Sequence, residues 1–349
     1  MTAALNALPP VRPDWLARHQ EEALEPGLPI VDPHHHLLDR PEHGTYLLPE
    51  LLADLGSGHD VRATVYVEWQ SMYRADGPPE MRPVGEVEFA NGVAAMAASG
   101  RYGGGRACAG IVGHADLTLG ARLAPVLDAM AAAAGERFRG VRFIAASDPD
   151  QLEWGAVVQR PPGLLREPTV REAFALLAPR GLGFDTWIFH PQLGDLADLA
   201  RAFPDTRICL DHIGGPIALG RFRGRHDEVF ADWRRGLREL AACPNVHVKL
   251  GGMGMKLFGF GFHERELAPD SQTLAAAWRP WVETCIESFG SGRAMFESNF
   301  PVDKAAYAYG VFWNACKRLA KGFSDTEKAD LFHGTASRFY GLGPLPPSR

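Results

Sequence analysis

The chain has 349 residues and a formal net charge of −6 at pH 7, and 46% of its residues are hydrophobic. This composition is typical of a globular protein, and the negative charge argues against a nucleic-acid or anionic-membrane partner. The five cysteines are scattered and form no CxxC pair, which argues against a disulfide framework or a structural zinc site. We see no signal peptide and no stretch near the ~20 apolar residues of a membrane span, so we expect a cytoplasmic protein.

Residues 1–30 are rich in proline and then polar, and we expect them to form an N-terminal arm on one domain that covers residues 31–349. From residue 30 onward, β-rich runs alternate with segments of helical periodicity. The expected strands are 30–36, 63–69, 107–112, 140–144, 184–189, 207–210, 246–250 and 294–298. The expected helices are 86–98, 121–134, 170–178, 193–203, 228–242, 273–289, 305–320 and 324–332.

The alternation of eight strands with helices predicts a parallel sheet. Eight such units in one chain of this length favour a closed α/β barrel, a single (β/α)8 TIM barrel. An open, doubly wound sheet is the alternative, and the lack of a GxGxxG motif after an early strand weakens it.

Polar side chains stand where the expected strands end, which is where such barrels carry their active sites. Each residue alone is more often a structural group than a catalyst, but their recurrence at every strand predicts a functional site. They are His34, His36, Glu68, Gln70, His114, Arg142, His190, Asp211, His212, Lys249, Glu297 and Asn299. Because side chains two apart on a strand share a face, His34 and His36 should point together.

Four motifs, taken in order, resemble those of the amidohydrolase superfamily. They are Asp-x-His-x-His at 32–36, Phe-Arg-Gly-Val-Arg at 138–142, Leu-Asp-His-Ile-Gly-Gly-Pro at 210–216 and Phe-Glu-Ser-Asn-Phe-Pro-Val at 296–302. The branch most similar contains lactone hydrolases such as pyrone-dicarboxylate lactonase, sulfomuconolactone hydrolase and fuconolactonase. The resemblance extends from residue 31 to 340 and implies a hydrolase on a metal-dependent hydrolase fold.

The resemblance also implies roles for individual residues. His34 and His36 match a pair that binds a divalent metal or, in metal-free lactonases, the substrate carbonyl. His190 and His212 match metal-binding or substrate-polarising histidines. Arg142 matches an arginine that grips a substrate carboxylate, a contact that suits its planar fork.

One departure from the family pattern lies at the eighth strand. The family places its general-base aspartate where this chain has Asn299, and an amide cannot take a proton at neutral pH. Glu297 stands where the family has glycine, and Asp303 lies just beyond. We expect Glu297, with a pKa raised by burial, or else Asp303, to replace the missing base. The alternative is a structural ion pair of Glu297 with Lys249 or Arg142.

We therefore predict a lactonase-like hydrolase that opens a small, carboxylated lactone or related ester. His34, His36, His190, His212, Glu297 and Asn299 are the expected catalytic residues. Arg142, Glu68, Trp69, Lys249 and Asp303 are expected to contact the small-molecule substrate. A decarboxylase on the same scaffold and a catalytically inactive binding protein are the alternatives.

We expect either no metal or one weakly held divalent ion, because Asn299 is a poorer ligand than a carboxylate. If an ion binds, zinc on His34, His36 and His190 is the expected site. The sequence leaves a homo-oligomer open.

Overall fold

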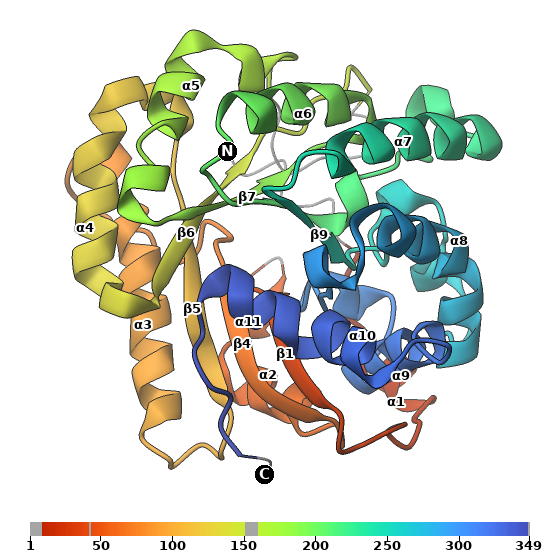
Figure 1. Ribbon diagram of the computed structural model, residues 1–349. Helices are drawn as coiled ribbons and strands as arrows, with labels where there is room; N and C mark the ends of the chain where they lie inside the picture. The colour runs from red at the N-terminus through yellow and green to blue at the C-terminus, as the bar shows by residue number, and fades with distance from the viewer. Residues whose placement is uncertain (1–8, 42, 151–159, 348–349) are drawn as a thin grey trace.

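The computed structural model describes residues 9–41, 43–150 and 160–347 (Figure 1). Eight parallel strands form the central sheet, and each pairs with the next along the chain. The strands are β1 (Pro29–His35), β4 (Asp60–Val67), β5 (Arg106–His114), β6 (Phe138–Ile144), β7 (Gly183–Trp187), β8 (Ile208–Leu210), β9 (Val246–Leu250) and β10 (Ala294–Phe296).

The first and last strands meet just beyond the end of β10. Phe300 forms a parallel bridge with His35, and the backbone N–H of His36 donates to the carbonyl of Phe300 at 2.7 Å. The N–H of Asn299 donates to the carbonyl of His34 at 2.9 Å. These bonds join the two edges of the sheet at its C-terminal end, so the expected single TIM barrel is confirmed.

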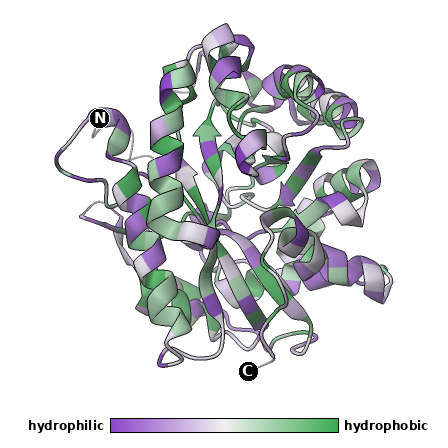
Figure 2. Ribbon diagram, turned by 60° about the vertical axis from the view of Figure 1, so that its left-hand side comes forward, coloured by the Kyte–Doolittle hydropathy of each residue, from purple (hydrophilic) through white to green (hydrophobic). Residues whose placement is uncertain are grey.

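Helices surround the barrel, and most follow a strand directly (Figure 1). Hydrophobic and hydrophilic residues share these helices, as expected when one face packs on the sheet (Figure 2). The helices that follow the strands are α2 (Leu48–Leu55), α3 (Val84–Ala98), α4 (Ala124–Ala134), α5 (Pro168–Phe174), α6 (Leu193–Ala202), α7 (His226–Ala241), α8 (Ser271–Phe289), α9 (Tyr309–Leu319), α10 (Asp325–Ala329) and α11 (Thr335–Tyr340).

The described part of the N-terminal arm, from residue 9, lies against α8, α9 and the loop before α8. It contains the short helix α1 (Pro13–Ala17), whose Trp15 indole donates to the carbonyls of Arg265 and Glu266. Further along, the ammonium of Lys317 in α9 donates to the carbonyl of Leu24 at 2.6 Å. The arm thus reaches β1 along the outside of the barrel.

Two regions differ from the expected elements. The segment 41–60, to which no expected helix or strand was assigned, contributes to a hairpin of β2 (Leu38–Arg40) and β3 (Gly44–Tyr46) and contains α2. Glu50 begins α2 by accepting a hydrogen bond from the N–H of Leu47, a capping pattern that was overlooked. The last expected helix, 324–332, is α-helical only to Ala329 in α10, and a π-helical turn, η14 (Asp330–Gly334), follows it.

The helical segment Leu117–Arg137 spans 21 residues with a mean hydropathy of 1.3, long and apolar enough to cross a membrane by length and composition alone. One such helix is weak evidence for a membrane span, so the expectation that the chain has none stays a prediction. A covering helix of a barrel can meet the same criteria, and this segment is bent at Gly120, where φ is +58°. Its main part, α4, buries Leu127 and Met130. The cytoplasmic location stays a prediction.

Candidate active site

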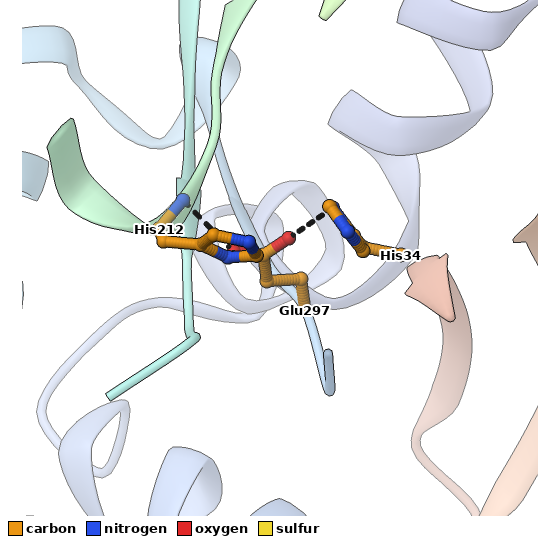
Figure 3. Close-up of side chains that lie close together, drawn as sticks. All are labelled: His34, His212 and Glu297. Atoms are coloured by element: carbon orange, nitrogen blue, oxygen red, sulfur yellow. Dashed lines mark hydrogen bonds and ion pairs between the residues drawn. The ribbon is translucent and has the colours of Figure 1, made fainter. Parts of the chain in front are cut away.

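His34, His212 and Glu297 meet at the C-terminal ends of their strands. The carboxylate of Glu297 lies between the two imidazoles (Figure 3). Its Oε1 is 2.6 Å from Nδ1 of His212, and its Oε2 is 2.8 Å from Nδ1 of His34. The two rings are 4.7 Å apart, and all three side chains are buried. Glu297 therefore points inward and bridges two histidines, whereas the expected alternative paired it with Lys249 or Arg142.

Two glycines after β9 make this close approach sterically feasible. A Cβ on Gly252, where φ is +72°, would lie 2.5 Å from the ring of His212. A Cβ on Gly251 would lie 2.5 Å from Cγ of Glu297. In sequence this segment looks merely flexible, so its role in packing the site was missed.

Asp32 fixes β1 to the segment that follows β10. Its carboxylate accepts from the N–H and hydroxyl of Ser298, at 3.1 and 2.6 Å, and from the hydroxyl of Tyr309 at 2.9 Å. It also accepts from the N–H of His34 at 3.3 Å. Asp32 therefore sets the spacing between His34 and Glu297.

The charges of these groups follow from their neighbours. Burial alone would raise the pKa of Glu297, but the adjacent His212 and His34 lower it to about 2, so the expected rise in this pKa was wrong. Burial lowers the pKa of His212, although Glu297 opposes that shift. For His34, burial and Lys249 lower the pKa, but Glu297 and Asp211 outweigh them and the net shift is upward. We infer a neutral His212 and an ionised Glu297 beside a readily protonated His34.

Lys249 lies beneath the histidines and is fully buried. Its ammonium is 2.6 Å from Asp185, 3.0 Å from Asp211 and 3.0 Å from Nδ1 of His34. Burial lowers the pKa of Lys249, but the two carboxylates more than reverse this shift. The two carboxylates accept two of its three N–H groups, and Nδ1 of His34 can accept the third only while that nitrogen carries no proton. Its expected contact with substrate stays a prediction, and its observed role is to hold two carboxylates.

Arg142 is also engaged within the protein. Its Nε donates to Oε1 of Glu68 at 2.8 Å, and Nη2 donates to the backbone carbonyl of Glu68. The remaining Nη1 lies 3.4 Å from Nε2 of His34. Glu68 therefore occupies the fork that was expected to grip a substrate carboxylate.

Trp69 follows Glu68 and is held by a carboxylate of α3 that was missed in the sequence. Its N–H donates to Oε1 of Glu86 at 2.7 Å, and its ring lies 6.4 Å from that of His36. Burial, with the charge of Glu68, raises the pKa of Glu86 to about 8. The helical spacing of α3 made Glu86 look like an ordinary polar residue.

His36 belongs to a chain of side chains that runs away from Glu297. Its Nδ1 lies 2.8 Å from the carbonyl of Val67, and its Nε2 lies 3.2 Å from Oδ1 of Asn299. The amide nitrogen of Asn299 donates to Oδ1 of Asp303 at 3.0 Å. Tyr307, also missed, donates its hydroxyl to the other oxygen of Asp303. Asp303 thus reaches His36 through Asn299.

His190 is not grouped with the other histidines. β7 ends at Trp187, whose ring packs 4.7 Å from that of His212, and His190 lies in the turn beyond. Its Nδ1 accepts from the N–H of Ile217, and its ring is 4.9 Å from Phe222. Its predicted catalytic role remains a prediction.

The described residues contain one set of ligand atoms that all lie within 4.8 Å of one another, those of His34, His212 and Glu297. This set differs from the expected His34, His36 and His190. Two imidazoles and a carboxylate suit a divalent ion with an open position. Within the described residues, Oδ2 of Asp211 accepts no hydrogen bond, and the surrounding carboxylates outnumber the permanent cations. The donors and the charge therefore fit one divalent cation.

Comparison with known proteins places this site in a family. The uncharacterized protein y4mH of Sinorhizobium fredii is 32% identical over 333 residues, which cover 89% of this chain and 98% of that protein. An L-fucono-1,5-lactonase of Burkholderia ambifaria is 29% identical over 239 residues, 67% of this chain and 71% of that protein. A crystal structure of a Burkholderia multivorans amidohydrolase with bound zinc superposes with a TM-score of 0.67 at 25% identity, covering 91% and 99% of the two chains.

The sequence model of the amidohydrolase family matches residues 31–342, which is nearly the whole barrel. The match spans His34, His212 and Glu297, most of β1 and all of the other seven strands of the barrel. The expected resemblance to the lactonase branch is confirmed by the relatives. This chain belongs to the amidohydrolase family and is a hydrolase.

Proposed function

We propose that this hydrolase opens a small lactone by attack of water on the ring carbonyl. The observation that carries the proposal is the carboxyl group of Glu297 held between His34 and His212 at the mouth of the barrel. The relatives named L-fucono-1,5-lactonase support a lactone as the substrate class.

His212 is the proposed general base. Its Nδ1 faces the carboxylate of Glu297 at 2.6 Å and therefore carries the proton, which leaves Nε2 as an acceptor. A lowered pKa keeps this ring neutral and able to take a proton from water. As the C–O bond of the ring breaks, the same Nε2 can return the proton to the departing alkoxide oxygen. Glu297, with a pKa of about 2, is too weak a base for this task and instead orients His212.

Positive charge near the carbonyl comes from His34 and Arg142. Nη1 of Arg142 lies 3.4 Å from Nε2 of His34, so two cationic groups can be adjacent at the mouth. Such charge stabilises the oxyanion that develops when water adds to the carbonyl. Lys249 keeps Asp185 and Asp211 paired beneath them.

The site can also hold a divalent ion on His34, His212 and Glu297, and we propose zinc because two imidazoles and one carboxylate form a typical zinc set. A zinc ion at this point would polarise the carbonyl and lower the pKa of water. Metal analysis of the purified protein tests this. We expect at most one zinc per chain, and zinc that binds equally well after His34→Ala would contradict the assignment.

The charge of the site favours an uncharged, hydroxylated lactone over the carboxylated one expected from sequence. Glu68 already occupies the guanidinium of Arg142, so no free fork remains there for a substrate carboxylate. Within the described residues, the second oxygen of Glu68 is buried and accepts no hydrogen bond, so it can accept one from a substrate hydroxyl. The L-fucono-1,5-lactone named for the relatives is such an uncharged, hydroxylated molecule.

A panel of substrates tests the function. We expect acid release from L-fucono-1,5-lactone or another sugar lactone, little from 2-pyrone-4,6-dicarboxylate, and no CO2 from aromatic acids. His212→Gln serves as the inactive control. Release of CO2 without lactone opening would instead support the decarboxylase.

A further inference from the structure

We propose that Asp303 is a positioning residue that acts through the side-chain amide of Asn299. It decides whether Nε2 of His36 is open to an O–H donor, either water or a substrate hydroxyl. The inference concerns the proposed lactone-opening site, and only its kinetic test rests on the proposed function.

The direction of the hydrogen bonds is fixed at the His36 end of the series His36–Asn299–Asp303. A backbone carbonyl only accepts, so Nδ1 of His36, 2.8 Å from the carbonyl of Val67, carries the proton. Burial, with the charges of His34 and Arg142, keeps the pKa of His36 well below its usual value, so the ring is neutral and Nε2 bears a lone pair. The oxygen and nitrogen of the Asn299 amide are distinguished only by their partners.

When Asp303 is ionised, one contact in the chain is unfavourable. Its carboxylate accepts from the amide nitrogen of Asn299 at 3.0 Å, which turns the amide oxygen toward His36. That oxygen and Nε2 of His36 then face each other at 3.2 Å, although both are acceptors. Two buried acceptors in contact require a donor between or beside them. This open arrangement therefore attracts an O–H group.

When Asp303 is protonated, the same chain closes on itself. The carboxylic acid can donate to the amide oxygen of a rotated Asn299, whose nitrogen then donates to Nε2 of His36. The contact between Asn299 and His36 now joins a donor to an acceptor, and His36 has no acceptor left for a ligand. Protonation of Asp303 thus converts a state in which Nε2 of His36 can accept from a ligand into one in which Asn299 already donates to it.

The surroundings of Asp303 allow both states near neutral pH. Burial raises its pKa to about 7, although hydrogen bonds from Tyr307, the N–H of Gly254 and Asn299 oppose the shift. The titratable groups that face it are Tyr307 on the turn after β10 and Glu297, whose charge raises the pKa further. Gly254 is needed for this packing, because a Cβ there would lie 2.9 Å from Cγ of Asp303.

Three variants test the proposal by their pH profiles. In the wild type, we expect kcat/KM for the sugar lactone to rise through a limb near pH 7. Asp303→Asn can donate to Asn299 at every pH, so the limb should vanish and activity at pH 8 should fall by about tenfold or more. Tyr307→Phe removes a hydrogen bond that lowers the pKa of Asp303, so its limb should move to higher pH. The exposed Asp205→Asn is the control and should match the wild type.

The kinetic constants also identify the donor. A higher KM in Asp303→Asn would indicate that the donor is a substrate hydroxyl. A lower kcat with unchanged KM would indicate that the donor is the attacking water. A limb that persists in Asp303→Asn, or that fails to move in Tyr307→Phe, would overturn the proposal.

A measurement without substrate separates this inference from the proposed function. In protein labelled with 15N-histidine, the Nε2 resonance of His36 should shift between pH 5 and 9 as its partner changes from amide nitrogen to amide oxygen. The shift should be absent from Asp303→Asn. If the shift occurs but no lactone is opened, the proposed function fails and the inference stands. A resonance that is independent of pH in the wild type would overturn the inference itself.

Discussion

Glu297 and Asp303 lie in the same segment after β10, and both are fully buried, yet their carboxyl groups behave in opposite ways. The pKa of Glu297 falls to about 2, and that of Asp303 rises to about 7. Burial favours the neutral acid in both cases. The difference lies in the partners, since Glu297 contacts two imidazoles whereas Asp303 receives neutral hydrogen bonds.

The contrast divides the site into two parts with different tasks. Around Glu297, charged groups orient the imidazole that moves a proton. Around Asp303, a neutral chain controls the hydrogen bonding of His36. A buried carboxyl group can therefore serve either purpose, depending on whether a cation lies within reach.

The largest expected effect on the charged part comes from its base. Replacing His212 with Gln should lower kcat by about 10³-fold, because the group that takes the proton from water is lost. Steady-state kinetics with the sugar lactone measure this, and circular dichroism checks the fold. A loss of less than tenfold would remove His212 from the role of base.

Glu297→Gln should have the next largest effect, about 10²-fold on kcat. The amide can still accept from His212, but it no longer supplies the charge that stabilises an imidazolium. The pH dependence of kcat should also change, because Glu297 raises the pKa of His34. If kcat is unchanged, the carboxylate is only a structural group.

The contributions of the two carboxyl groups to the stability of the folded protein should change with pH in opposite directions. A lowered pKa stabilises the folded protein at pH values above the ordinary pKa of the group. The greater free energy of unfolding of wild type relative to Glu297→Gln should therefore disappear as the pH falls from about 4.5 to 2. A group with a raised pKa destabilises the folded protein as the pH increases. The stability of Asp303→Asn should therefore rise relative to that of wild type between about pH 4 and 7. We expect about 3 to 4 kcal/mol for each, since one pKa unit corresponds to ~1.4 kcal/mol and the two pKa values move from 4.5 to about 2 and from 3.8 to about 7. Urea unfolding across pH measures both, and parallel curves would contradict the contrast.

The smallest effect is expected outside both parts. His190→Gln should lower kcat/KM by less than about threefold, because its ring packs on Phe222 and not on His34 or His212. It is the matched control for His212→Gln. A loss comparable to that of His212→Gln would return His190 to the catalytic group.

The barrel and much of the site could be predicted because they depend on local patterns. Alternation along β1 placed His34 and His36 together, and the strand order brought His212 and Glu297 to the same mouth. The position of His190 could not be predicted, since the pattern does not tell how far a residue lies beyond the end of its strand. The pKa of Glu297 was predicted in the wrong direction, because its partners come from strands remote in sequence.

The pairing of Arg142 with Glu68 depends on a similar long-range contact. Both residues were recognised as polar residues at strand ends, but no local pattern shows that the guanidinium of Arg142 is bound by the carboxylate of Glu68. The same holds for Lys249, whose carboxylate partners come from β7 and from the residue after β8. The residue types were therefore predictable, whereas their charges and free donors required the three-dimensional contacts.

The most direct test of the account is an NMR titration of the two side-chain carboxyl carbons in 13C-labelled protein, assigned with Glu297→Gln and Asp303→Asn. The account predicts that Glu297 remains ionised at every pH above about 4 and that Asp303 titrates near pH 7. A Glu297 carboxyl that titrates near neutral pH would make it a competent general base. That result would contradict its assignment as the anion that orients His212.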